Sequence, residues 1–106
     1  MSAKRVEALE AVQADLEYAR SFYESWKPGS RDEILRKYFE AVDWIEWNPD
    51  LFPRRFGAIQ RVILRRSYFV LYFLQEPERS VVLAVLDGRR NPRTIRRLVA
   101  TRRKSA

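Results

Sequence analysis

Arginine is the residue type whose chemistry stands out in this 106-residue sequence. Four arginines, Arg61, Arg65, Arg89 and Arg90, lie within or directly after apolar segments of the second half. The planar guanidinium group forms paired hydrogen bonds with carboxylates and phosphates, and it stays charged when partly buried. We therefore expect these four side chains to bind an anionic partner or target.

The distribution of charge supports an anionic partner. Residues 1–53 contain 7 basic and 11 acidic residues, a net charge of −4, whereas residues 54–106 contain 14 basic and 3 acidic residues, a net charge of +11. Thirteen of those 14 basic residues are arginines. A basic surface that only keeps the protein in solution is the alternative interpretation.

Several kinds of chemistry are excluded by composition. The sequence has no cysteine and no histidine, so it lacks disulfides, thiolate zinc sites and the base of a Ser-His-Asp hydrolase. We expect no metal and no organic cofactor. The apolar run Tyr68–Leu74 is far shorter than the roughly 20 residues of a membrane span, and the N-terminus lacks the apolar core of a signal peptide. We expect a cytoplasmic protein without membrane contact.

Two helices are predicted in the first half. Residues Lys4–Leu9 fit either an opening strand or the start of the first helix. Apolar residues then recur at helical spacing at Val12, Leu16, Ala19, Tyr23 and Trp26. Pro28 and Gly29 end this helix. Ser30 and Glu33 predict a capping box at the start of a second helix, which Asn48-Pro49 ends.

In the second half, after a predicted loop at Asp50–Gly57, the spacing of apolar residues changes from helical to a period of two. Three strands are predicted, at Ile59–Arg66, Tyr68–Gln75 and Ser80–Asp87, and their short connections imply an antiparallel meander. Asn91-Pro92 begins a short C-terminal helix. The predicted fold is a single α+β domain over residues 1–106, in which an N-terminal edge strand and a helical hairpin pack on a small antiparallel sheet, with a disordered tail over about 101–106.

The order of these segments resembles the RelE/ParE superfamily, the toxins of bacterial type II toxin-antitoxin systems, often called plasmid stabilization proteins. The matching segments are Ala14-Asp15-Leu16, Phe22-Tyr23-Glu24, Asn48-Pro49-Asp50-Leu51, Arg61–Arg65, Tyr68–Tyr72 and Val82–Pro92. Many relatives carry histidine where this chain has Asp87. We interpret Asp87 as a carboxylate that pairs with one of the two following arginines, and Gly88 as a residue with an unusual backbone angle.

The resemblance implies a toxin neutralised by a cognate acidic antitoxin, in a hetero-oligomeric complex. The ribonuclease branch, which cuts mRNA on the ribosome, has basic or tyrosine residues at positions that here hold Arg61, Ile63, Phe69, Arg89 and Ile95. Only two of these five keep that chemistry. The ParE-like branch is therefore favoured, and some of its members poison DNA gyrase. On this reading the protein is not an enzyme, and Arg61, Arg65, Arg89 and Arg90 contact the antitoxin or the target.

Two alternatives remain open. If the chain is a ribosome-dependent endoribonuclease, Arg61 and Arg89 steady the phosphate and Tyr72 assists proton transfer. A buried core tyrosine is the competing interpretation of Tyr72. In the other alternative, the arginine-rich segment Arg89–Lys104 binds nucleic acid by itself. We rank this last, because in such operons the antitoxin normally supplies the DNA-binding domain.

Overall fold

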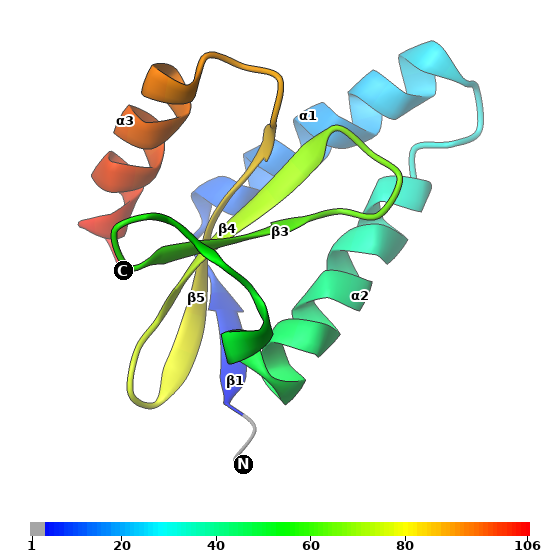
Figure 1. Cartoon of the computed structure of the whole chain (residues 1–106). Helices are drawn as coiled ribbons and strands as arrows, with labels where there is room; N and C mark the ends of the chain where they lie inside the picture. The colour runs from blue at the N-terminus through cyan, green and yellow to red at the C-terminus, as the bar shows by residue number, and fades with distance from the viewer. Residues whose placement is uncertain (1–3) are drawn as a thin grey trace.

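Two helices cover one face of a central sheet, and a third helix covers part of the opposite face (Figure 1). This computed structural model describes residues 4–106. Met1–Ala3, which belong to the predicted domain, lie outside the described residues. Within residues 4–106 the elements form an α+β fold, as predicted.

The sheet has the strand order β1-β5-β4-β3-β2 in the described part of the chain. Its strands are β1 (Arg5–Ala8), β2 (Arg54–Phe56), β3 (Ile59–Ile63), β4 (Phe69–Gln75) and β5 (Arg79–Asp87). The predicted meander is confirmed as β3, β4 and β5, which pair antiparallel. The N-terminal segment is the predicted edge strand, and it runs parallel to β5.

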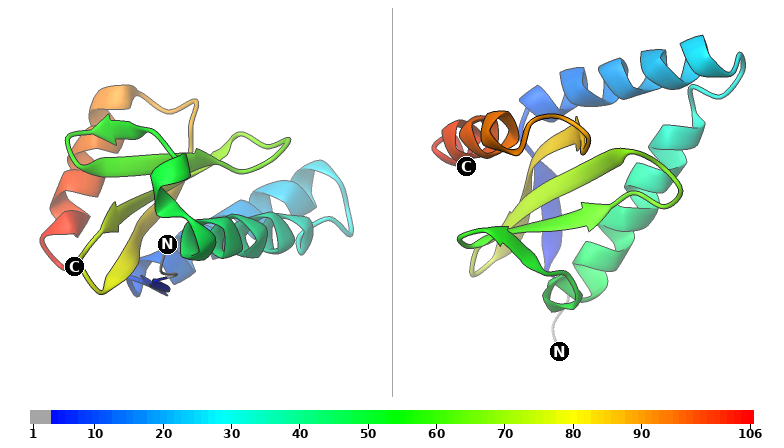
Figure 2. Two further views of the ribbon diagram at one scale, coloured as in Figure 1. Left: turned by 60° about the horizontal axis from the view of Figure 1, so that its bottom comes forward. Right: turned by 45° about the horizontal axis from the view of Figure 1, so that its top comes forward.

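The helices are α1 (Ala11–Trp26), α2 (Glu33–Trp47) and α3 (Pro92–Arg103). Helices α1 and α2 meet at their connecting turn and diverge away from it (Figure 2). The predicted capping box is wrong. The Ser30 hydroxyl is buried and donates to the carbonyl oxygens of Tyr23 and Lys27, so it closes α1 and caps nothing on α2, which begins at Glu33.

The hairpin and the sheet share one apolar core. Residues at helical spacing on both helices are buried in it, as the sequence pattern predicted; they include Val12, Ala19, Tyr23, Ile34, Tyr38, Ala41 and Ile45. Strand residues Val62, Leu71, Phe73 and Val82 face them. Alternation along β3 therefore sends Val62 toward the helices and Arg61 toward the opposite face.

The opposite face has its own core beneath α3. Ile95 and Val99 of the helix pack with residues of β4 and β5, among them Tyr72 and Leu83. Strand β5 is buried on both faces, as expected of a central strand. The Asn91 side chain accepts a hydrogen bond from the amide of Arg93, with Pro92 at the first helical position, which confirms the predicted start of α3.

The C-terminal segment differs from its prediction. Helix α3 continues to Arg103, past Thr101, where the disordered tail was expected to begin. The reason is an ion pair between Arg102 and Asp15 of α1. The second guanidinium nitrogen of Arg102 lies 2.9 Å from Asp15 Oδ1, and Arg102 also donates to the Leu83 carbonyl at 3.1 Å.

This ion pair also satisfies backbone groups at the edge of β5 that no strand pairs with. Strand β1 pairs with β5 only as far as Val82, and a bulge at the following residue shifts the register of β5 against β4. Beyond Val82 the edge of β5 presents polar backbone groups. Asp15 accepts a hydrogen bond from the Val85 amide at 3.0 Å, and Arg102 donates one to the Leu83 carbonyl oxygen. Two side chains thus replace the missing strand.

The segment Asp50–Gly57 is not the plain loop that was predicted. It contains a 3-10 turn, Pro49–Leu51, and strand β2. Gln60 organises it from the neighbouring strand, because its buried amide donates to the carbonyl oxygens of Pro49 at 2.9 Å and Phe52 at 2.8 Å. A single buried amide therefore holds the 3-10 turn and Phe52 against β3, directly before β2, which is too short to show a period of two.

Membrane-spanning and metal-binding features are absent from the described region. No helix within residues 4–106 is long and apolar enough to cross a bilayer. The same residues include no cluster of three or more acidic, histidine or cysteine side chains able to hold a metal ion.

Candidate functional site

One end of the sheet gathers most of the predicted arginines. The Gly88 amide donates to the Tyr68 carbonyl at 2.7 Å, and Asp87 lies opposite Phe69, so the β3–β4 turn and the segment after β5 are neighbours. We call this region the arginine end, defined by Arg65, Arg66, Arg89 and Arg90. All four side chains are exposed. Arg65 also lies 3.7 Å from Glu40 of α2.

Arg89 is the most firmly held of these side chains. Its Nε and Nη2 atoms donate to the two oxygens of Asp87 at 3.0 and 2.7 Å, which confirms the predicted pairing of Asp87 with a following arginine. Its guanidinium group lies 3.9 Å from the centre of the Tyr68 ring and 5.6 Å from that of Phe22. The ion pair and the ring contacts together fix a planar cation at the surface.

The Asp87–Arg89 pair predicts a pH dependence of stability. Hydrogen bonds from Arg89 lower the pKa of Asp87, although partial burial opposes them. A carboxylate with a lowered folded-state pKa stabilises the fold above its unfolded pKa of about 3.9. That contribution is lost as the pH falls through the folded-state pKa. We expect Asp87→Asn to be less stable than the parent at neutral pH, with the difference vanishing in acid; urea unfolding from pH 2 to 7 measures it. A difference independent of pH would contradict the assignment.

Gly88 allows the end of β5 to pack closely against β4. Its backbone is not in the left-handed region, so the predicted unusual angle is wrong. A Cβ atom at this position would lie 2.8 Å from Cγ2 of Val70 and 3.2 Å from the Tyr68 carbonyl oxygen. Glycine therefore lets the end of β5 approach β4 and brings Arg89 onto Tyr68.

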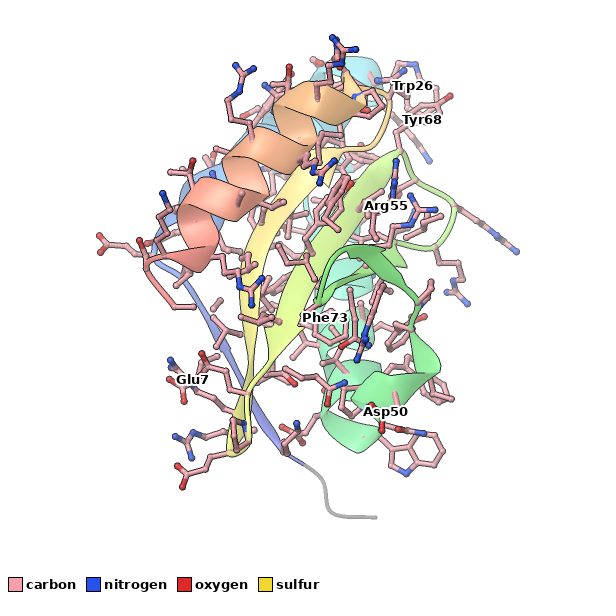
Figure 3. The ribbon with its side chains drawn as sticks, turned by 60° about the vertical axis from the view of Figure 1, so that its left-hand side comes forward. Glu7, Trp26, Asp50, Arg55, Tyr68 and Phe73 are labelled. Atoms are coloured by element: carbon pink, nitrogen blue, oxygen red, sulfur yellow. The ribbon has the colours of Figure 1, made fainter. Side chains whose placement is uncertain are left out.

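An aromatic pocket adjoins the arginine end. It has a volume of about 290 Å³ and is lined by Phe22, Tyr23, Trp26, Arg66, Ser67 and Tyr68. Trp26 and Tyr68 are 74% and 52% exposed, and they lie at the same end of the molecule (Figure 3). Trp26 was predicted to belong to the buried stripe of the first helix, but it is the last residue of α1 and extends beyond the core.

Arg61 lies apart from the arginine end. It pairs with Tyr72 across β3 and β4, on the face of the sheet that α3 covers only in part. Tyr72 is 2% exposed and stacks on Phe56, with the ring centres 6.0 Å apart. Burial raises the pKa of Tyr72, with Arg61 and Arg55 opposing the rise. The burial of Tyr72 therefore supports its interpretation as a core residue.

The three residues of the nuclease alternative are not grouped together. Tyr72 lies opposite Ala84, whereas Arg89 follows Asp87, which lies opposite Phe69. Tyr72 and Phe69 are three positions apart on β4, roughly 10 Å along the strand. Arg61 and Tyr72 are neighbours, but Arg89 is directed to Tyr68 and Phe22 at the end of the sheet.

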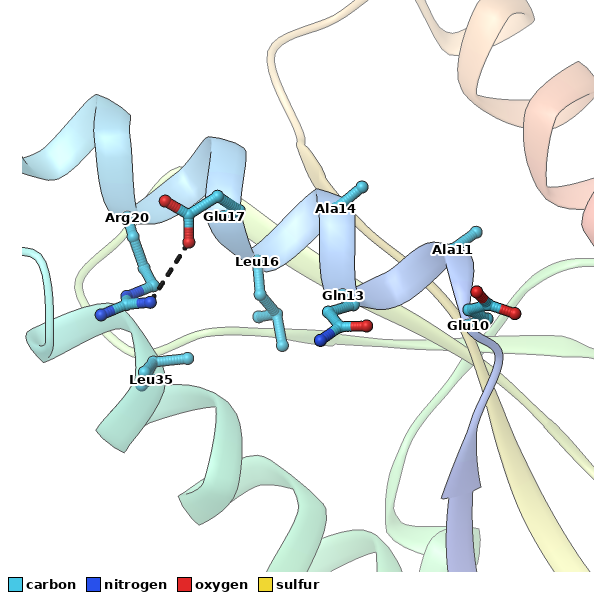
Figure 4. Close-up of a pocket in the computed structure, with 8 residues that line it drawn as sticks. All are labelled: Glu10, Ala11, Gln13, Ala14, Leu16, Glu17, Arg20 and Leu35. Carbon is cyan, nitrogen blue, oxygen red and sulfur yellow. Dashed lines mark hydrogen bonds and ion pairs between the residues drawn. The ribbon is translucent and has the colours of Figure 1, made fainter.

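Two further hollows lie beside the hairpin. A groove of about 320 Å³ runs between α2 and β3, with Trp44, Leu51 and Ile63 half exposed along it. Trp44 lies on the flank of the buried stripe of α2. A wider cleft of about 820 Å³ opens where α1 and α2 diverge (Figure 4). Its lining includes Glu17 and Arg20, which are paired at 3.2 Å.

These features define a class of protein: a small basic α+β domain that presents arginine and aromatic side chains at one end of its sheet. The model of the family "ParE toxin of type II toxin-antitoxin system, parDE" matches residues 6–92. The chain therefore belongs to the ParE toxin family, which confirms the resemblance to the RelE/ParE superfamily and its ParE-like branch.

A solved structure supports the same fold. The chain is similar to a structure described as the chromosomal ParDE TA system from P. aeruginosa, with a TM-score of 0.68 and 15% sequence identity. The similarity covers 78% of this chain and 94% of that one. A search of curated protein sequences gave no significant match.

Proposed function

We propose that this ParE-family toxin acts in the cytoplasm by binding an essential macromolecule, with DNA gyrase as the candidate target, and that a cognate acidic antitoxin neutralises it. The observation that carries the proposal is the family match over residues 6–92. The arginine end and the aromatic pocket fit a role in binding. They supply cations and exposed rings, the side chains that dominate protein interfaces.

The antitoxin would be an acidic chain with aromatic or aliphatic anchors. Arg65, Arg89 and Arg90 would pair with its carboxylates at the arginine end, while Arg61 would meet it on the open face of β3. Trp26 and Tyr68 would receive its apolar side chains. A segment that is disordered when free would order on this surface and form a hetero-oligomer with the toxin.

The ribonuclease alternative has less support. Cleavage through the ribose 2′-hydroxyl requires a proton acceptor and a proton donor close to a cation that holds the phosphate. Tyr72 is buried in the middle of β4 with a raised pKa, whereas Arg89 lies beyond the end of the strand pair. Of the two arginines in this alternative, only Arg61 lies beside Tyr72.

Induced expression in bacteria tests the proposal. We expect growth arrest with DNA breaks and filamentation, inhibition of supercoiling by purified gyrase, and rescue by the acidic product of the neighbouring gene. Primer extension on cellular mRNA serves as the contrasting measurement. Discrete cuts within codons, without any effect on gyrase, would establish the nuclease alternative instead.

A further inference from the structure

The outward face of α3 carries a basic stripe. We call it the α3 stripe, and its members are Arg93, Arg96, Arg97, Arg103 and Lys104. At 3.6 residues per turn these positions fall within about a third of the helix circumference and extend over roughly 16 Å. They lie on the side away from Ile95 and Val99, which are buried against the sheet.

The stripe has no partner within the domain. All five side chains are exposed, and among residues 4–106 none of them forms an ion pair or a side-chain hydrogen bond. Arg102 of the same helix behaves differently, because it points inward and pairs with Asp15. The stripe is therefore available to a ligand, whereas Arg102 anchors the helix.

Helix stability does not account for the first half of the stripe. Cations near the C-terminus of a helix interact favourably with its dipole, which explains Arg103 and Lys104. Arg93 lies in the first turn, where cations are unfavourable, and that turn contains no acidic residue. Arg93 also lies three and four residues from Arg96 and Arg97, at the spacing where like charges repel. These arginines are destabilising, so a binding role explains them better.

The composition of the stripe favours phosphate over protein. Protein interfaces depend on aromatic and aliphatic anchors. The large exposed apolar side chains of residues 4–106 lie on α1, α2, the 3-10 turn, β3 and the β3–β4 turn, and none lies on α3. Single-stranded nucleic acids also need aromatic platforms for their bases. A row of arginines without rings suits the phosphate backbone of a duplex, which needs only spaced cations.

We infer that the α3 stripe, which is part of the Arg89–Lys104 segment, binds the phosphate backbone of double-stranded DNA without reading its sequence. This role differs from operator recognition, for which an antitoxin normally supplies the DNA-binding domain. A stripe of roughly 16 Å faces about five phosphates of one strand, at 3.4 Å of helix axis per phosphate. This activity is separate from antitoxin binding, which we assign to the arginine end and the aromatic pocket. It would place the toxin on the DNA that its target also occupies.

The test is binding of the purified full chain to a fluorescent 20-base-pair duplex, measured by anisotropy between 50 and 200 mM salt. With five phosphate contacts, the logarithm of the association constant should fall with the logarithm of salt with a slope of about −4.5. The triple variant Arg93→Gln, Arg96→Gln, Arg97→Gln should reduce the slope to about −1.8 and weaken binding about 100- to 1,000-fold at 100 mM salt.

A matched control removes the same charge elsewhere. Arg36, Arg54 and Arg55 are exposed and form no ion pair in the described part of the chain, so replacing all three with glutamine should change affinity far less. The α3 variant should unfold at an equal or higher urea concentration than the parent, because destabilising cations are removed. Equal losses in both triple variants, or tighter binding to the single strand or to polyglutamate than to the duplex, would overturn the inference.

Discussion

Replacing Asp15 with alanine is expected to lower the free energy of unfolding by about 3 to 5 kcal/mol. The Asp15 and Arg102 side chains are only 9% and 17% exposed, so the change leaves a shielded guanidinium group without its counter-charge. It also removes the acceptor of the Val85 amide at the edge of β5. A small domain is stable by roughly 5 to 15 kcal/mol, so this single substitution would remove a large fraction of the total stability. Equilibrium urea unfolding followed by circular dichroism measures the loss.

Further variants separate the causes of this loss. Arg102→Met alone should also be strongly destabilising, whereas its combination with Asp15→Ala should cost less than the sum, because a buried pair removed as a whole leaves no unpaired charge. Asp15→Asn retains an acceptor for the Val85 amide and should be intermediate. Glu17→Ala is the control, since the Glu17 side chain is 56% exposed and its pairs with Arg20 and Arg31 lie at the surface, where such pairs are each worth about 1 kcal/mol or less. If Asp15→Ala costs no more than Glu17→Ala, the edge of β5 does not depend on this ion pair.

The helices and the meander could be predicted because their signals are local. Apolar residues at helical spacing identify α1 and α2, and the change to a period of two with short connections identifies β3, β4 and β5. The start of α3 is equally local, because Asn91 and Pro92 are adjacent in the sequence. Each of these features requires only a few neighbouring residues.

The features that were missed depend on residues far apart in the chain. Asp15 and Arg102 are separated by 87 positions, and each one reads as an ordinary charged residue of an amphipathic helix. Gln60 holds the segment before β2 through the carbonyl groups of Pro49 and Phe52, and no periodic pattern reveals these contacts. The capping box at Ser30 failed for a different reason, because the hydroxyl turns back to the nearby carbonyl of Tyr23 at the end of α1.

The arginines of the site were predicted with mixed success. Arg89 and Arg90 follow β5 and Arg65 lies in the β3–β4 turn, so strand pairing brings them to one end of the sheet. Arg61 lies further along β3, beside Tyr72, because a strand of known register separates residues by a fixed rise. The aromatic pocket was not predicted, because a tryptophan at helical spacing is normally interpreted as a buried core residue. Only the end point of α1 shows that Trp26 lies beyond the sheet.

Trp26 and Tyr68 should contribute more to antitoxin affinity than any arginine of the arginine end. This expectation rests on the proposed neutralisation by an antitoxin. Buried aromatic anchors at interfaces each contribute about 2 kcal/mol or more, whereas charges at the rim mainly affect the association rate and its salt dependence. We expect the double variant Trp26→Ala, Tyr68→Ala to weaken the toxin-antitoxin complex by about a thousandfold, measured by calorimetry or by surface-based kinetics.

Trp47 provides the matched control, because it is 58% exposed but lies at the end of α2, outside the lining of the aromatic pocket. Trp47→Ala should leave the affinity within about threefold of the parent, a difference under 1 kcal/mol. Arg89→Gln should slow association and flatten its salt dependence, since the rim charge steers the encounter and is not the anchor. If Trp47→Ala weakens the complex as much as the double variant does, the aromatic pocket is not the principal anchor of the antitoxin. In that case the DNA-binding inference for α3 would still stand, because it depends on neither Trp47 nor the aromatic pocket.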